Sequence, residues 1–190
     1  MAPPEALALT AEDRGELLRL ARAAIEARLQ GGAPSAGAPS RALAERCGVF
    51  VSLRRRDSGE LRGCVGYLEP CFRLGEAVVR AAVAAATADG RFDPVTLAEL
   101  PSLALDVSVL GRPRPLAPDQ VEVGVHGLLV RCGGRSGLLL PQVATEHGWD
   151  REAFLDHACL KAGLPPGAWR EPGAELLAFT AVVVHEDGAA

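Results

Sequence analysis

The segment 103–110 alternates strictly between large apolar residues and smaller or polar ones. One face of the extended chain carries Leu103, Leu105, Val107 and Val109, and the other carries Ala104, Asp106 and Ser108. This pattern predicts a strand that is buried on one side, and such strands are typical of antiparallel sheets. The fold therefore has to include an antiparallel sheet that packs one face against a core.

Two more strand-like runs, residues 48–53 and 61–68, flank a polar turn at 55–60 that contains Gly59. Their spacing predicts a β-hairpin with a loop of several residues. The second strand of this hairpin contains the hexapeptide Leu61-Arg62-Gly63-Cys64-Val65-Gly66. We interpret these six residues as the candidate ligand-binding site.

The composition of this hexapeptide is unusual for a purely structural strand. Gly63 and Gly66 lie on either side of Cys64, and glycine weakens a strand unless a bulge or a closely approaching group requires it. Arg62 places a fixed positive charge near Cys64, and such a neighbour favours a thiolate. Cys64 is therefore the candidate catalytic residue, although the sequence names no reaction.

Three more residues complete the candidate site: Asp106, His126 and His157. Asp106 is a candidate acid or base if its strand face lines a cleft, and a solvated strand residue is the alternative. His157 lies on a helix predicted at 151–161, where it either faces a cleft or has a structural or solvated position. None of the five cysteines forms a C-x-x-C pair, so we expect no metal site and no cofactor.

Size and charge restrict the possible functions. A chain of 190 residues can form one domain or two small lobes with a real core. Its formal net charge of −4 argues against nonspecific binding to nucleic acid. No secretory signal is recognisable, and no run approaches the ~20 apolar residues of a membrane span. We therefore expect a cytoplasmic protein without membrane attachment, with its cysteines as free thiols.

The remaining elements follow from apolar periodicity and breaker residues. A helix is expected after the capping sequence that begins at Thr10, and it ends at Gly31. An alanine-rich buried helix is expected at 74–89. A last strand at 176–185 is expected to join the main sheet. Three prolines at 113, 115 and 118 mark the best boundary between two lobes.

The sequence resembles the AMMECR-one domain family, in particular the group called AmmeMemoRadiSam system protein A. The hexapeptide 61–66 is nearly that family's signature, with Val65 where isoleucine is usual. The match continues at Arg91-Phe92, Glu99-Leu100-Pro101, 105–110, 121–128, 136–144, Gly148-Trp149-Asp150 and 159–165. It covers nearly the whole chain.

The resemblance implies an α+β fold with two lobes. The larger lobe, residues 1–111 and 171–190, would hold an antiparallel sheet flanked by helices. The smaller lobe, residues 112–170, would hold its own short antiparallel sheet, with the hexapeptide facing a cleft between the lobes. The resemblance also implies a Memo-like protein and a radical S-adenosylmethionine protein as partners, without fixing an activity.

Two functions of different classes remain open from the sequence. In the first, the protein is a binding module for a peptide, a protein or another sizeable ligand, and Cys64 is a small buried residue. In the second, it is an enzyme or enzyme subunit in which Cys64 is a nucleophile or redox thiol and Arg62 tunes it or binds an anionic substrate. We favour the binding module, because few ionisable residues accompany Cys64 in the sequence.

Overall fold

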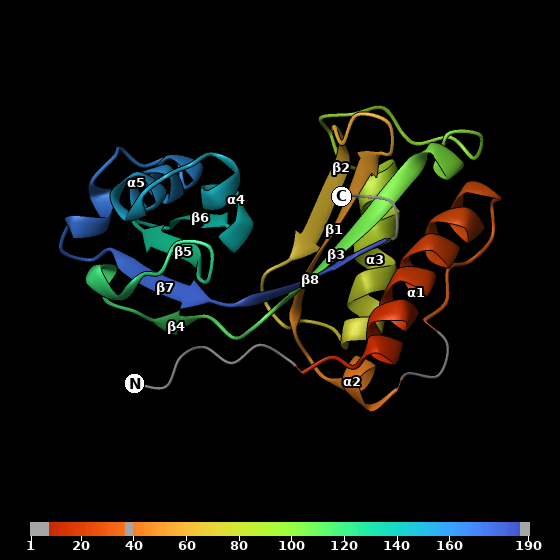
Figure 1. The fold of residues 1–190 in the computed structure, drawn as a ribbon, viewed down its shortest axis with the longest axis horizontal. Coiled ribbons are helices and arrows are strands. Elements are labelled where there is room, and N and C mark those ends of the chain that lie inside the picture. Colours follow the sequence, from red (N-terminus) through yellow and green to blue (C-terminus); the bar gives the residue numbers. More distant parts are fainter. Residues whose placement is uncertain (1–7, 37–39, 187–190) are drawn as a thin grey trace. The chain divides into compact units, whose positions relative to one another are not determined.

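The fold was analysed in a computed structural model that describes residues 8–36 and 40–186. The chain divides into two compact units. We call residues 8–36, 40–110 and 182–186 the host unit, and residues 111–181 the inserted unit, because they lie between two segments of the host (Figure 1). Each unit has its own antiparallel sheet and helices, which confirms the predicted α+β fold.

The host unit is built on a four-stranded sheet with the order β2-β1-β3-β8. Its strands are β1 (Gly48–Arg55), β2 (Leu61–Tyr67), β3 (Leu103–Leu110) and β8 (Ala181–His185). Its helices are α1 (Ala11–Leu29), α2 (Arg41–Ala44), α3 (Leu74–Thr87) and the short η1 (Leu100–Ser102). The predicted hairpin is confirmed, since β1 and β2 pair antiparallel.

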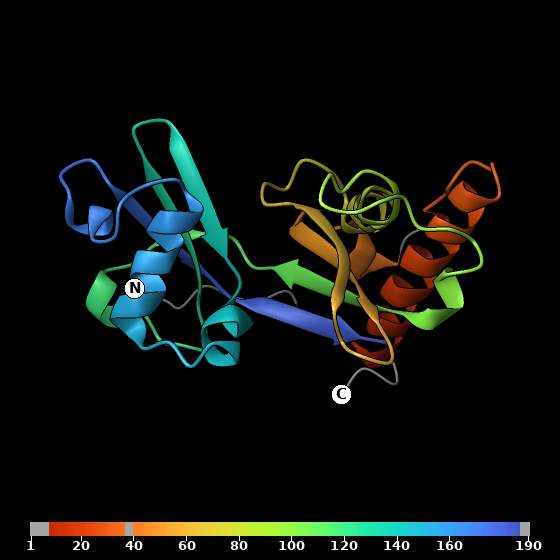
Figure 2. The ribbon, with the colours of Figure 1, turned by 90° about the horizontal axis from the view of Figure 1, so that it is seen from above.

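The two long helices of the host unit form as the sequence predicts. Thr10 and Asp13 make a reciprocal capping box at the start of α1. Helix α3 buries almost every side of its first three turns, because its alanines let it pack closely against α1, β1 and β2. Both helices contribute to one core with the large residues of β1 and β3, so they lie on one face of the sheet (Figure 2).

The inserted unit contains a second four-stranded sheet with the order β4-β7-β5-β6. Its strands are β4 (Arg114–Pro115), β5 (Gly127–Cys132), β6 (Arg135–Leu139) and β7 (Glu175–Phe179). Its helices are α4 (Pro141–Glu146), α5 (Arg151–Lys161), η2 (Pro118–Gln120) and η3 (Ala168–Arg170). Phe154, Leu155 and Ala158 of α5 are buried in its core with β5.

The expectation of one continuous strand at 176–185 was wrong. The chain instead forms β7 in the inserted unit and β8 in the host unit, with Thr180 between them. The apolar alternation runs through both strands, so a period of two residues cannot reveal that the pairing partner changes. The inserted unit therefore extends to residue 181, beyond the expected lobe of 112–170, because β7 pairs with β5.

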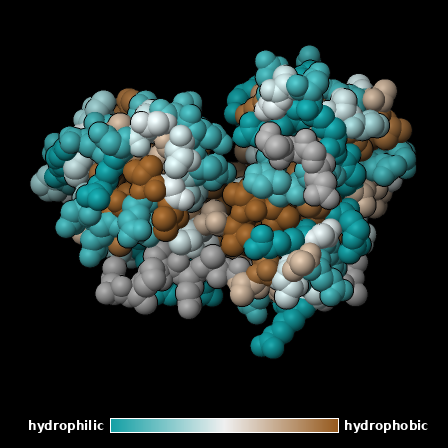
Figure 3. Space-filling model, viewed as in Figure 1, coloured by the Kyte–Doolittle hydropathy of each residue, from teal (hydrophilic) through white to brown (hydrophobic). Residues whose placement is uncertain are grey.

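Apolar side chains reach the surface of each unit in the view of Figure 3. Leu97 of the host unit and Val125 and Leu160 of the inserted unit are the large apolar residues that stand out as exposed among the described residues. Single exposed side chains of this kind are normal on globular proteins and need no special function. Within the described residues, no helix has the length and apolar character needed to traverse a lipid bilayer.

Candidate functional site

The register of the host sheet aligns polar residues from all four strands. Cys64 of β2 lies opposite Ser52 of β1, and Ser52 in turn lies opposite Asp106 of β3. The Ser52 Oγ lies 3.2 Å from the Cys64 Sγ, and the Nδ1 of His185 on β8 lies 2.8 Å from an Asp106 carboxylate oxygen. We call Cys64, Ser52, Asp106 and His185 the polar row.

The polar row lies on the sheet face opposite the helices. Val51 and Leu53, the neighbours of Ser52 on β1, are fully buried in the core that α1 and α3 share. Because successive residues of a strand point to opposite faces, Ser52 and its partners across the sheet point away from these helices. On this face Cys64 and Ser52 are half-buried and Asp106 is buried.

Asp106 is buried and has two side-chain partners within the host unit. It is 8% exposed, and its second carboxylate oxygen accepts a hydrogen bond of 3.2 Å from the Arg54 Nε. It is therefore not the solvated residue that one reading of the sequence allowed. His185, whose side chain is 58% exposed, is oriented by this carboxylate, which leaves its Nε2 for another partner.

Arg62 contacts a carboxylate rather than Cys64. Its Nε and Nη2 donate to the two carboxylate oxygens of Glu99 at 2.7 and 3.1 Å, and the two side chains are 12% and 19% exposed. The guanidinium also lies 5.9 Å from the centre of the Phe92 ring. The charge of Arg62 is thus balanced by Glu99, so the structure gives little support to Arg62 as a binder of anionic substrates.

The outer edge of β2 is closed at Cys64 by two residues that follow α3, Asp89 and Arg91, which we call the edge clip. An Asp89 carboxylate oxygen accepts the backbone N–H of Cys64 at 2.8 Å, and the Arg91 Nη2 donates to the Cys64 carbonyl at 3.3 Å. Arg91 also donates to Asp89 at 2.6 and 2.9 Å. These hydrogen bonds from Arg91, with that of the Cys64 N–H, hold the pKa of Asp89 far below its ordinary value.

The two glycines of the hexapeptide are explained by contacts within the chain. A Cβ on Gly63 would lie 2.2 Å from the carbonyl oxygen of Ala85 on α3. A Cβ on Gly66 would lie 2.2 Å from the Val49 carbonyl oxygen and 2.5 Å from the Phe50 ring. The close approach that the sequence predicted at these positions is therefore made by the protein's own helix, strand and aromatic ring.

His126 and His157 belong to the inserted unit and have local partners there. His126 is 6% exposed, and its Nδ1 accepts the backbone N–H of Glu122 at 3.0 Å, which stabilises a turn. The His157 ring stacks on Trp149 with 3.7 Å between ring centres, and His147 lies over Trp149 at 4.7 Å. Both predicted histidines thus have structural contacts, and the structure places neither in the polar row.

Among the described residues, no hydrogen bond joins the Cys64 thiol to a histidine or a carboxylate. The Cys64 side chain interacts with the Ser52 hydroxyl and with the Arg91 guanidinium, and neither group is a base at neutral pH. His185 is three strand spacings away in the register, roughly 14 Å at 4.8 Å per spacing. Within the described residues, no group of three or more His, Cys, Asp or Glu side chains is placed to hold a metal ion.

Sequence reasoning missed Ser52, Arg54, Asp89 and His185 as partners of the candidate residues. Ser52 and His185 join the row only through strand pairing between distant segments. Asp89 carried one local signal, because an acidic residue directly after a buried helix needs a partner. Arg54 belongs to the basic triplet 54–56, which reads as a solvated turn.

Comparisons with known proteins agree with this architecture. The family model AMMECR1 matches residues 18–184. Protein MK0488 of Methanopyrus kandleri is 47% identical over 188 residues, covering 94% of this chain and 91% of its own. A protein of Methanothermobacter thermautotrophicus is 44% identical over 190 residues, covering 95% and 97%.

The crystal structure of protein PH0010 from Pyrococcus horikoshii superposes with a TM-score of 0.85 at 42% identity, covering 92% of each chain. The family match includes Cys64, Ser52 and Asp106 of the polar row and the entire inserted unit, and it ends one residue before His185. The chain therefore belongs to the AMMECR1 family.

Proposed function

We propose that this protein is a binding module that recognises a polar segment of a partner protein on the polar row of the host sheet. The observation that carries the proposal is the fixed orientation of exposed His185 by buried Asp106, on the sheet face opposite the host helices. A preoriented imidazole loses little conformational freedom on binding, which favours recognition.

The polar row suits hydrogen bonding to a peptide more than it suits covalent chemistry. It presents a hydroxyl, a thiol and an imidazole, while the carboxylate of Asp106 is already shared between Arg54 and His185. A partner segment with amide and hydroxyl groups would complement these donors and acceptors. The expected cleft between two lobes stays a prediction, and the polar row belongs to the host unit alone.

A Memo-like protein and a radical S-adenosylmethionine protein are the partners that the family resemblance suggests. Their binding is measured by biolayer interferometry with the purified full-length chain. We expect His185→Ala to weaken binding of a true partner about tenfold, the loss of roughly 1.4 kcal/mol that one good polar contact provides. His147→Ala serves as the control, because His147 is an exposed histidine of the inserted unit.

The enzyme alternative makes a different prediction for the same partners. Cys64→Ser keeps a small side chain beside Ser52, so a binding module retains its affinity and its cellular activity. An enzyme that uses the Cys64 thiolate loses activity in this variant while the fold remains intact. Equal binding by wild type and His185→Ala, together with loss of cellular activity in Cys64→Ser, would replace the binding module by the enzyme.

A further inference from the structure

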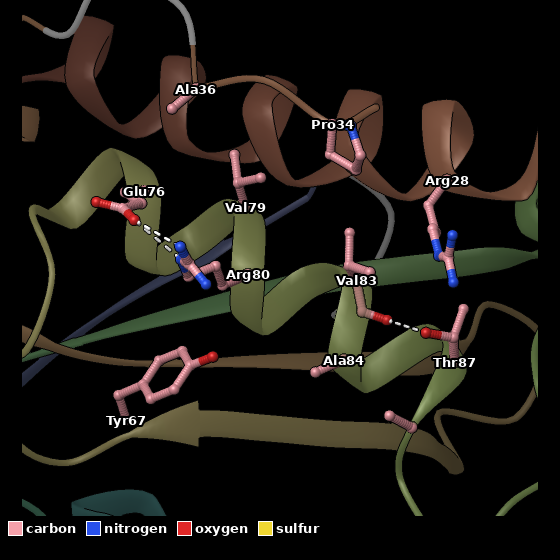
Figure 4. A pocket seen from close by; sticks show the side chains of 11 residues that line it. Arg28, Pro34, Ala36, Tyr67, Glu76, Val79, Arg80, Val83, Ala84 and Thr87 are labelled. Carbon is pink, nitrogen blue, oxygen red and sulfur yellow. Dashed lines mark hydrogen bonds and ion pairs between the residues drawn. The ribbon is translucent and has the colours of Figure 1, made fainter. Parts of the chain in front are cut away.

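A pocket of about 550 Å³ lies along α3 on the host unit, away from the residues of the polar row. Figure 4 shows α3 running between Tyr67 of β2 on one side and Pro34, from the segment after α1, on the other. Its volume falls within the range of small-molecule sites, roughly 300–1,000 Å³. We propose that this pocket binds a small amphipathic anion, a single negatively charged group attached to an apolar body.

The floor of the pocket is apolar. Val79 and Val83 lie four positions apart on α3, about one helical turn, and with Ala84 they form an apolar strip along the pocket. The Tyr67 ring adds a wall, and no other described residue makes a hydrogen bond with its hydroxyl. An aliphatic or aromatic body bound over this strip would displace water. The free energy of binding becomes more favourable as more apolar surface is removed from water.

The charges at the pocket select an anion. At one end Glu76 and Arg80 neutralise each other through an ion pair of 2.9 Å. At the other end Arg28 of α1 extends toward the turn of α3 that carries Val83 and Thr87 (Figure 4). The Arg28 guanidinium makes no hydrogen bond or ion pair with any described residue, so the pocket has one unbalanced positive charge.

The side chains of Thr87 and Arg80 at the pocket already have partners within the protein. The Thr87 hydroxyl donates its hydrogen to the Val83 carbonyl at 2.8 Å and is not free to donate to the ligand. Arg80 is held by Glu76 and by the Phe72 ring, 4.5 Å from its guanidinium. Arg28 is therefore the residue expected to bind the anionic group, and a planar guanidinium fits carboxylate and phosphate alike.

The test is calorimetric titration of the full chain with octanoate, octyl phosphate and 1-octanol. We expect saturable binding of at least one anion, weakened by salt, and weaker binding of the uncharged alcohol. Arg28→Gln should weaken anion binding about fivefold and leave the alcohol unchanged, as expected for a largely exposed ion pair. Arg14→Gln is the matched control, an exposed arginine of the same helix outside the pocket.

A second variant tests the apolar floor independently of Arg28. Val83→Glu places a negative charge on the half-buried strip and should abolish binding of all three probes, with thermal unfolding showing that the fold is retained. The octanoate and octyl phosphate titrations distinguish a carboxylate head from a phosphate. Absence of saturable binding, or equal anion affinity in Arg28→Gln and Arg14→Gln, would overturn the proposed site.

Discussion

The carboxylate of Asp89 accepts the backbone N–H of Cys64 at 2.8 Å, on the edge strand β2 of the host sheet. Edge strands offer unpaired N–H and C=O groups to other chains, and natural proteins commonly cover them. At Cys64 both groups are occupied, the N–H by Asp89 and the C=O by Arg91. The edge clip thus fixes β2 at the residue that the sequence singled out as the candidate thiol.

Replacing Asp89 should destabilise the host unit. Asp89→Asn removes the negative charge of this buried carboxylate and weakens its hydrogen bonds with the exposed Arg91 guanidinium, so we expect a loss of about 1–3 kcal/mol in the free energy of unfolding. The free energy of unfolding is measured by urea denaturation. Asp93→Asn in the same loop is the control; its side chain is exposed and is not part of the edge clip, so its effect should stay within about 0.5 kcal/mol.

The same carboxylate predicts how stability depends on pH. The pKa of Asp89 is lower in the folded chain, through the hydrogen bonds from Arg91, than in the unfolded chain, where it lies near 3.9. Its stabilising contribution is therefore present above the unfolded value and is lost as the pH falls toward the folded value. In urea denaturation from pH 7 to pH 3, the difference in unfolding free energy between wild type and Asp89→Asn should stay level near neutral pH and begin to narrow below about pH 4, and a difference that stays constant to pH 3 would contradict this assignment.

Gly63→Ala should be strongly destabilising, because its Cβ would overlap the carbonyl of Ala85 in α3. The backbone of β2 or α3 has to move, at a cost of about 1–3 kcal/mol for overpacking. Gly15→Ala is an informative comparison, because nothing lies within 4 Å of an added Cβ there and alanine favours the helix by about 1 kcal/mol. Thermal unfolding should shift in opposite directions, and a neutral Gly63→Ala would show that the contact with α3 is not tight.

The cysteines should react with iodoacetamide in the order of their environments. Cys71 is exposed and should react first, whereas Cys64 is half-buried beside Ser52 and should react more slowly. Burial raises the pKa of the Cys159 thiol, so little thiolate is available at neutral pH. We therefore expect iodoacetamide to label Cys159 only after the chain unfolds. Peptide mapping by mass spectrometry gives the order, and a Cys64 faster than Cys71 would favour the enzyme alternative.

The elements were predictable from the sequence because their signals are local. Alternation at 103–110 and the polar turn before Leu61 specify a strand and a hairpin without knowledge of the rest of the chain. The capping box at Thr10 is likewise read from four consecutive residues. The last strand was predicted wrongly, because alternation does not say which partner a strand will pair with.

The candidate site was predictable only as a location. The hexapeptide drew attention because glycines interrupt a strand, but their partners Ala85 and Phe50 come from elsewhere in the fold. Arg62 and Cys64 are two residues apart, yet a register shift in the β1–β2 pairing lies beside them, and the Arg62 guanidinium binds Glu99 instead. Pairings over long sequence distances decided the role of each residue, and one sequence does not reveal them.

The inserted unit enters and leaves the host sheet through hydrogen-bonded neighbours, because the Gly111 N–H donates to the Thr180 carbonyl at 2.8 Å. A segment whose two ends meet in this way is a cassette: a short linker from Gly111 to Thr180 could replace residues 112–179 without separating β3 from β8. The gene would then encode an uninterrupted four-stranded protein. Such a deletion is a route by which evolution, or an engineer, could exchange the cassette while the remaining scaffold kept its shape.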